Sequence, residues 1–241
     1  MKSPYFAIAP VLASSVIVAG AEAQTTGDEE RTLDPITVVG LRPVDIEDVT
    51  VSVTVLTEED FAVRNSPFVV DELRAIPGLA VSRNGAVGGL TQVRLRGAEA
   101  NQTLVLVDGI EVSDPVTGET DFGLWSGLDA GRVEVLRGEQ STFYGSDAIG
   151  GVINIVTNKD TSFAALAEVG SRGSWRLDAR GGIATDNAYL VVSTGNNITG
   201  GADTSGLDGE TDGTQQYSGT VRAGLEAGGW QFSALARYAN A

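Results

Sequence analysis

The chain has 241 residues, enough for one large domain or two small ones, and its 32 acidic and 16 basic side chains give a formal net charge of -16. This acidity argues against a nucleic-acid partner, because phosphate binding needs a basic surface. Since the chain has no cysteine and no histidine, it cannot form disulfides, thiolate nucleophiles, imidazole bases or the commonest zinc sites.

The first 23 residues have the composition of a secretory signal peptide. Lys2 gives a short positive start, Ala7–Ala19 is apolar, and Ala21–Ala23 has the small-x-small pattern of a cleavage site. We expect cleavage before Gln24. An uncleaved anchor is the alternative, which the short run and its interruption by Pro10 disfavour. No stretch has the roughly 20 apolar residues of a spanning helix, so a membrane form of the chain requires barrel strands.

Residues 24–41 join a polar stretch to a short β-prone one. Gln24–Arg31 shows no periodicity and is predicted to be disordered, whereas Leu33–Gly40 (LDPITVVG) carries an apolar run. An isolated run of this kind cannot bury itself, so we expect it to pair with a sheet edge. Pro35 confines it to the start or edge of such a strand. An ordinary first strand of the next domain is the alternative.

The following segment alternates between strand and helix signals. Val51–Leu56 has period two and predicts a strand, and Thr57 before three acidic residues predicts a capped helix start. Ser66-Pro67 begins a second predicted helix, which Pro77-Gly78 ends. The glycine-rich loop Arg83–Leu90 lacks the lysine and helix start of a phosphate-binding loop.

Two strand pairs and a loop complete this region. Leu104–Val112 reads as a hairpin, because Asp108-Gly109 tolerates the positive φ angles of a tight turn. Ser113–Gly127 is predicted to be an exposed loop. Arg132–Asn158 alternates, turns on glycine and alternates again, which predicts two more strands.

Beyond Asn158 the hydrophobic period is two. Apolar and polar residues alternate in Trp175–Arg180, Gln216–Glu226 and Trp230–Tyr238, with aromatics near the strand ends. Short turns and one long loop separate the runs, as in an outer-membrane barrel, and we count five strands. A soluble sandwich also alternates, but its linkers would be less uneven in length.

The long loop, residues 196–214, is rich in glycine and acidic residues. Oxygen ligands on a flexible backbone suit calcium, although the spacing is not that of a helix–loop–helix site. A solvated acidic loop is the alternative. The candidate ligands are Asp203, Asp208, Glu210 and Asp212.

Four of these segments resemble the plug domain of TonB-dependent outer-membrane receptors. They are Leu73–Val81 (LRAIPGLAV), Val93–Gly97 (VRLRG), Leu104–Val112 (LVLVDGIEV) and Arg132–Asn158 (RVEVLRGEQSTFYGSDAIGGVINIVTN). The resemblance is nearest to cobalamin receptors, which bind calcium in a comparable early outer loop. It implies an α+β plug domain, a small mixed sheet with short helices, over residues 42–158, and the first antiparallel strands of a transmembrane β-barrel over 159–241.

The resemblance also assigns roles to individual residues. In the family a TonB box follows the signal peptide, here Asp34, Pro35, Ile36, Thr37, Val38 and Val39. Ligand contacts are expected at Arg83, Asn84, Asp114, Asp121 and Trp125. Contacts between plug and barrel are expected at Arg94, Arg96, Arg132 and Arg137, with direct ligand binding as their alternative. Glu139 departs from the family, which commonly has proline after the Arg-Gly pair.

The implied function is import of a scarce nutrient such as cobalamin across the outer membrane of a Gram-negative bacterium, with the N-terminal segment in the periplasm. TonB and its inner-membrane energising complex would supply the energy. No cofactor is required, and the 196–214 loop is a candidate calcium site. A ferric-siderophore receptor is the alternative. Because five strands cannot close the family's barrel of about 22, a fragment or a truncated, non-transporting gene product is a further alternative. No nucleophile elbow indicates an enzyme.

Overall fold

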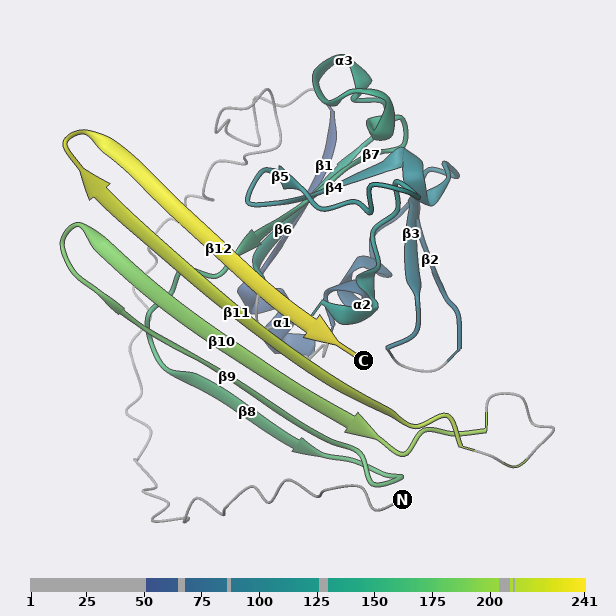
Figure 1. Ribbon diagram of the computed structural model, residues 1–241. Helices are drawn as coiled ribbons and strands as arrows, with labels where there is room; N and C mark the ends of the chain where they lie inside the picture. Colours follow the sequence, from purple (N-terminus) through teal and green to yellow (C-terminus); the bar gives the residue numbers. More distant parts are fainter. Residues whose placement is uncertain (1–50, 65–67, 86–87, 126–129, 204–208, 210) are drawn as a thin grey trace, which may run out of the picture. The chain divides into compact units, whose positions relative to one another are not determined.

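The computed structural model describes residues 51–64, 68–85, 88–125, 130–203, 209 and 211–241 (Figure 1). The predicted signal peptide, the cleavage site before Gln24 and residues 24–41 lie outside these ranges. All of the described residues belong to one compact unit of the chain. No helix in the described ranges is both long enough and apolar enough to cross a membrane.

The N-terminal domain is built on a mixed sheet of five strands in the order β1-β6-β7-β4-β5. Its strands are β1 (Ser52–Thr57), β4 (Thr103–Val107), β5 (Ile110–Glu111), β6 (Ala130–Arg137) and β7 (Gly151–Thr157). Only β4 and β7 are parallel; the other neighbours are antiparallel. The parallel pair consists of nearly continuous apolar runs, and both strands are buried because such strands are covered on both faces.

Short helices and a second, two-stranded sheet surround the mixed sheet. The two strands, β2 and β3, are antiparallel to each other. These elements are α1 (Glu58–Arg64), α2 (Val69–Leu73), β2 (Leu79–Arg83), β3 (Thr91–Leu95), α3 (Ser141–Tyr144) and the 3₁₀ turns η2 (Ala100–Gln102), η3 (Phe122–Leu124) and η5 (Ser146–Ala148).

The helix starts differ in detail from the sequence prediction. At α1 the Asp60 carboxylate accepts hydrogen bonds from the backbone nitrogen and the hydroxyl of Thr57, at 2.7 and 2.9 Å. The start of α1 is therefore capped by the Asp60 side chain, which bonds back to Thr57, the residue before the helix. Helix α2 ends at Leu73, before the predicted stop at Pro77, and the backbone nitrogens of Ala75 and Ile76 then bond to the carbonyls of Glu72 and Leu73 in a tighter turn.

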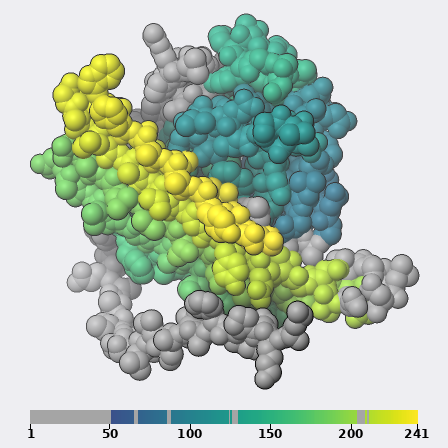
Figure 2. Space-filling view, in the orientation of Figure 1, coloured from purple at the N-terminus to yellow at the C-terminus, as the bar shows by residue number. Residues whose placement is uncertain are grey.

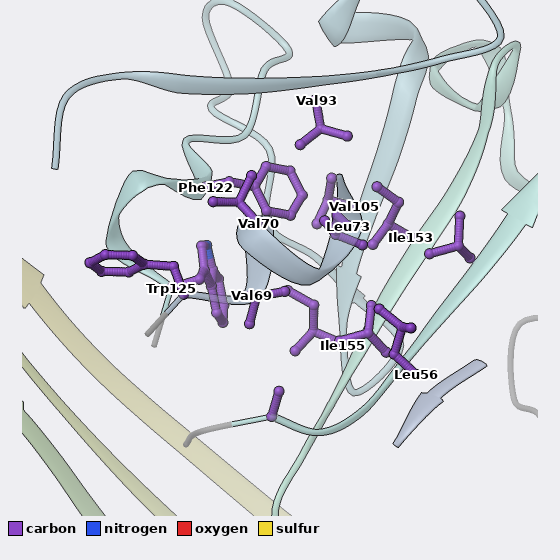
Figure 3. Close-up of a cluster of buried hydrophobic side chains, with 14 of the residues drawn as sticks. Leu56, Val69, Val70, Leu73, Val93, Val105, Phe122, Trp125, Ile153 and Ile155 are labelled. Carbon is purple, nitrogen blue, oxygen red and sulfur yellow. The ribbon is translucent and has the colours of Figure 1, made fainter. Parts of the chain in front are cut away.

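The main hydrophobic core lies on one face of the mixed sheet. The alternation of β6 and β7 turns Val135 and Ile153 toward this face, where they join Val70 and Leu73 of α2. Figure 3 shows Ile153, Val70 and Leu73 in this cluster. Phe122, from the 3₁₀ turn η3, is almost fully buried in the same cluster. A smaller cluster covers the opposite face. Its members are Leu104, Leu106, Leu136, Ala148 and Val152.

Five antiparallel strands follow and form a meander sheet in the order β12-β11-β10-β9-β8. They are β8 (Ala164–Val169), β9 (Trp175–Ala184), β10 (Ala188–Thr199), β11 (Thr214–Ala227) and β12 (Trp230–Asn240). No residue of β12 is buried, and Figure 2 shows this strand, in yellow, at the surface along its length. A mixed sheet with short helices followed by antiparallel strands confirms the predicted fold class.

The meander sheet is inverted relative to a sheet that faces water. In β9 the charged residues Arg176 and Asp178 are buried, 7% and 3% exposed, whereas Leu177 between them is 49% exposed. In β11 Arg222 is buried and its neighbour Val221 is exposed. Antiparallel sheets of soluble proteins bury the apolar face, while membrane barrels turn it outward.

We predict that Ile153→Ala destabilises the N-terminal domain by about 3 kcal/mol, because the substitution leaves a cavity at a fully buried site in the main core. The matched control Ile110→Ala, at a side chain that is 68% exposed, should change stability by less than about 0.5 kcal/mol. Denaturant unfolding of the folded protein, followed by hydrogen exchange of the β6 and β7 amides, measures both. Equal losses would contradict this assignment of the core.

Candidate functional site

The polar face of the meander sheet contacts the N-terminal domain through side chains of β9, β11 and β12. We call this set of contacts the inter-sheet contact. Its members are the ion pairs Arg180–Glu58, Arg180–Asp160 and Arg222–Asp108, the hydrogen bond from Gln216 to the carbonyl of Gly123, and the stacking of Arg237 on Trp125.

Arg222 lies at the centre of one half of this contact. Its Nη1 donates to Asp108 Oδ2, and its Nε donates to the hydroxyl of Tyr189 on β10 at 3.0 Å. The Arg222 side chain is 8% exposed, so it has lost most of its hydration. A buried guanidinium is tolerated only when such partners replace the lost water.

Asp108 is held by the fold in a position to receive this arginine. Asp108 and Gly109 have φ angles of 50° and 83°, as the tight turn between β4 and β5 requires. The Asp108 carboxylate also accepts hydrogen bonds from the backbone nitrogen and hydroxyl of Thr157, at 3.0 and 2.7 Å. One carboxylate thus joins the β4–β5 turn, the end of β7 and strand β11.

A series of buried polar contacts continues from this turn into the mixed sheet. Asn154 Oδ1 accepts from the Gly109 nitrogen at 3.2 Å, and Asn154 Nδ2 donates to Glu134 at 3.0 Å. Glu134 is fully buried and forms an ion pair with Arg132 at 2.9 Å. Burial, and then the negative charge of Glu134, raise the pKa of Tyr144. These polar contacts link the middle of the N-terminal domain to its contact with β11.

Arg180 forms the other half of the inter-sheet contact. Both of its terminal nitrogens donate to Glu58 Oε1 at 3.1 Å, and Nη2 also donates to Asp160 Oδ2 at 3.3 Å. Glu58 is the first residue of α1, and Asp160 lies in the connection between β7 and β8. Hydrogen bonds from the hydroxyl and backbone nitrogen of Ser162, and then the charge of Arg180, lower the pKa of Asp160.

The glycine-rich loop lies beside the start of β11, where the long loop of the meander sheet ends. A Cβ on Gly88 would lie 2.8 Å from Thr214 Cγ2 and 2.9 Å from Gln216 Nε2, so this approach requires glycine. Gln216 also donates to the carbonyl of Gly123 at 2.8 Å. The structure therefore brings three loops together at this end of β11.

Two of the predicted ligand residues, Arg83 and Asp121, bond to Thr91 in this loop region, and a third, Asn84, bonds to the neighbouring Leu90. Arg83 Nε donates to Thr91 Oγ1 at 3.2 Å, and the Thr91 nitrogen donates to Asp121 Oδ1 at 2.9 Å. Asn84 closes the same loop, since its nitrogen donates to the Leu90 carbonyl at 2.9 Å. Ligand binding by these residues stays a prediction.

The other two predicted ligand residues have structural contacts of their own. Trp125 is buried, and the Arg237 guanidinium lies 3.9 Å from its ring centroid, an arrangement that gives a cation–π interaction. The Asp114 carboxylate accepts from the nitrogens of Val116 and Thr117, at 2.9 and 2.8 Å, and these bonds lower its pKa. Asp114 therefore orders its own loop, and a ligand role for either residue stays a prediction.

Of the four arginines expected between plug and barrel, Arg94, Arg132 and Arg137 bond to residues within 54–134 of the described chain, and Arg96 lies close to Gly138. Their contact with barrel strands stays a prediction. Arg94 bonds to Ser82 and Gln92, Arg132 pairs with Glu134, Arg137 bonds to Pro77 O and Thr54, and Arg96 lies against Gly138.

Sequence reasoning missed the arginines of the inter-sheet contact. Arg180, Arg222 and Arg237 lie on the polar face that the period of two defines in β9, β11 and β12. Charged residues on that face must find partners, so the alternation itself was the signal that could have identified them.

The remaining predicted sites fall wholly or partly outside the described residues. This is true of the TonB box, Asp34–Val39, and of Asp208 and Glu210 in the predicted calcium loop. Asp203 accepts from the Gly209 nitrogen at 3.0 Å, and the Asp212 nitrogen donates to Ala202 O at 3.1 Å. Within the described ranges no three acidic residues are placed to hold a metal, so calcium binding stays a prediction.

Comparison with known proteins relates both the sequence and the fold to one class. Residues 45–152 match the family described as "TonB-dependent Receptor Plug Domain". The chain is 30% identical over 227 residues to the vitamin B12 transporter BtuB of Vibrio vulnificus (strain YJ016), an alignment that covers 88% of this chain and 37% of that protein. The chain therefore spans little more than a third of this curated relative.

Solved receptors have a similar fold. The ferric yersiniabactin uptake receptor FyuA from Yersinia pestis superposes with a TM-score of 0.62 at 26% identity, over 78% of this chain and 31% of that one. The siderophore receptor PiuA from Acinetobacter baumannii gives 0.64 at 17% identity, over 80% and 27% of the two chains, a likeness of fold alone.

We predict that Asp108→Asn weakens the inter-sheet contact by about 3 kcal/mol, because it leaves the Arg222 guanidinium buried without a carboxylate. Asp186→Asn, in the exposed turn between β9 and β10, is the matched control and should have little effect. Denaturant unfolding of the folded protein measures the difference. An Asp108→Asn variant as stable as the control would show that the ion pair does not hold the two sheets.

The lowered pKa of Asp160 gives a pH dependence of known sign. A carboxyl group with a depressed pKa in the folded state contributes stability above its unfolded pKa of about 3.9 and loses it as the pH falls through the folded value. We expect the Ser162 amide, which donates to Asp160, to keep its protection from exchange as the pH falls through the unfolded aspartate value of about 3.9, and to lose it only at lower pH, when Asp160 is protonated in the folded state. Asp160→Asn should remove this acid transition; an unchanged transition would contradict the assignment.

Proposed function

We propose that this chain, whose residues 45–152 match the plug-domain family of TonB-dependent receptors, serves in the uptake of a small nutrient across a bacterial outer membrane with energy from TonB. The observation that carries this proposal is the inverted meander sheet. Its apolar residues, such as Leu177 and Val221, are exposed, and its charged residues are buried against the domain that matches the plug. This arrangement supports a barrel wall with lipid outside and a plug inside.

We place ligand capture at the loop end of the plug. Arg83 and Asp121 bond to Thr91 there, Asn84 closes the same loop, and Gly88 packs against the strand that follows the long acidic loop. Fixed polar groups beside a barrel loop can recognise a ligand from the outside without any covalent chemistry.

Binding of TonB would act at the N-terminal end of the plug, on the residues that precede β1 in the sequence. The predicted box, Asp34–Val39, precedes β1 in the sequence, and β1 leads directly into α1, whose first residue is Glu58. A force on the box would therefore be transmitted along the chain to the Arg180–Glu58 ion pair before it reaches Asp108. Glu58 is more exposed than Asp108, and ion pairs at exposed groups are weak. The Arg180–Glu58 pair would therefore break before the more buried pair of Arg222 and Asp108.

For the substrate we propose a cobalamin, supported by the 30% identity to a vitamin B12 transporter. A calcium ion in the 196–214 loop is part of this proposal, with Asp203, Asp208, Glu210 and Asp212 as its ligands. A ferric siderophore is the second candidate, supported by the 26% identity to a ferric yersiniabactin receptor.

We predict that the native gene product restores uptake of radiolabelled cobalamin to cells that lack their own cobalamin receptor, and only when TonB is present. Val38→Pro should abolish uptake but preserve ligand binding, since proline removes a backbone donor from the strand that pairs with TonB. Thr26→Pro, upstream of the box, is the control and should transport normally.

Removal of calcium with a chelator should weaken cobalamin binding by at least tenfold if the acidic loop holds the ion. Binding of a ferric siderophore in place of cobalamin would select the second candidate. Uptake that is independent of both TonB and Val38 would contradict the proposed function.

A further inference from the structure

Tyr189 and Gly224 form an unusual cross-strand pair on the inner face of the meander sheet. They are register partners on β10 and β11. A Cβ on Gly224 would lie 2.1 Å from Tyr189 Cε1 and 2.6 Å from Cζ, closer than real contacts allow, so the ring lies across the glycine. The φ angle of Gly224 is outside the left-handed region, so the backbone itself does not require glycine here. Only the ring does.

The position of the ring determines where its hydroxyl lies. Gly224 is two residues beyond Arg222 on β11, and both residues belong to the same face of the strand. With the ring across Gly224, the Tyr189 hydroxyl accepts a hydrogen bond from Arg222 Nε at 3.0 Å. This bond fixes one edge of the guanidinium, and the Nη1 atom then donates to Asp108.

Space beside the guanidinium leaves room for a different orientation of the Arg222 side chain. A cavity of 520 Å³ borders Tyr189, Arg222 and Gly224, and its lining includes Glu226, a second carboxylate on β11. Arginine has many rotamers, and ordering them costs conformational entropy. Without the Tyr189 hydroxyl, the side chain is free to turn into the cavity and away from Asp108.

We propose that Tyr189 and Gly224 are positioning residues for the attachment of the plug to the barrel wall. Gly224 makes room for the Tyr189 ring, the ring places its hydroxyl on Arg222, and the oriented Arg222 holds Asp108 at the β4–β5 turn. The inference rests on the proposed function only for its consequence, which is that the strength of this attachment sets how readily the plug is released.

Hydrogen exchange of the native gene product in outer membranes, without ligand or TonB, tests the proposal. The reporters are the amides of Gly109 and Thr157, which bond to Asn154 and Asp108. Tyr189→Phe and Gly224→Ala should each raise their exchange rates about tenfold, the effect of losing one hydrogen bond to a charged group. Tyr189→Phe keeps the ring and is the milder change, so it remains informative if Gly224→Ala folds poorly.

The chain supplies matched controls. Gly219→Ala lies on the same strand, where a Cβ would meet no atom closer than 3.9 Å, and Tyr217→Phe removes the hydroxyl of an exposed tyrosine on β11. Both should leave exchange at Gly109 and Thr157 unchanged.

A double-mutant cycle separates positioning from strand packing. In an Asp108→Asn background Arg222 has no carboxylate at the β4–β5 turn to be held against, so adding Tyr189→Phe should raise the exchange of Gly109 no further. A further rise of the same size there, or no rise in the single variants, would overturn the proposal. Because the assay involves no transport, failed cobalamin uptake would count against the proposed function and leave this result standing.

Discussion

Burial of charged side chains on one face of the meander sheet is the constraint on which the rest of the structure depends. A buried guanidinium or carboxylate costs several kcal/mol unless partners replace its hydration. Arg180 and Arg222 find those partners at Glu58 and Asp108 of the N-terminal domain and at Asp160 in the connection between β7 and β8. Without the N-terminal domain, the arginines of the meander sheet would lose the carboxylates that compensate their burial. The exposed apolar side chains of the other face suit a lipid environment.

The fold supplies these partners at well-ordered positions. Asp108 sits in a turn with two positive φ angles, and Thr157 and Asn154 brace the turn from β7. Glu58 begins α1, where the charge of an acidic residue also complements the helix N-terminus. Both arginines of the contact are buried, but the Asp108 side chain is 18% exposed and the Glu58 side chain 51%, so the Arg222–Asp108 pair is better shielded from water than the Arg180–Glu58 pair.

The sequence predicted the fold well because its signals are local. The Asp108-Gly109 hairpin, the runs of β6 and β7, and the alternation of β9 and β11 each follow from side-chain period and turn chemistry. It predicted the partners of the arginines poorly. Arg222 and Asp108 are 114 residues apart, and no local pattern pairs them. Tyr189 and Gly224 depend on strand register, which only the assembled sheet fixes.

The central claim, that the apolar face of the meander sheet meets lipid and its polar face meets the plug, is tested most directly by single-cysteine labelling along β11. The chain has no native cysteine, so each introduced thiol is the only one. In intact outer membranes we expect a spin label at Val221→Cys to collide with oxygen dissolved in lipid, and a label at Thr220→Cys to be screened from both oxygen and a water-soluble relaxation agent. Collision of the Val221 label with the water-soluble agent, at a rate typical of an aqueous surface, would contradict the account.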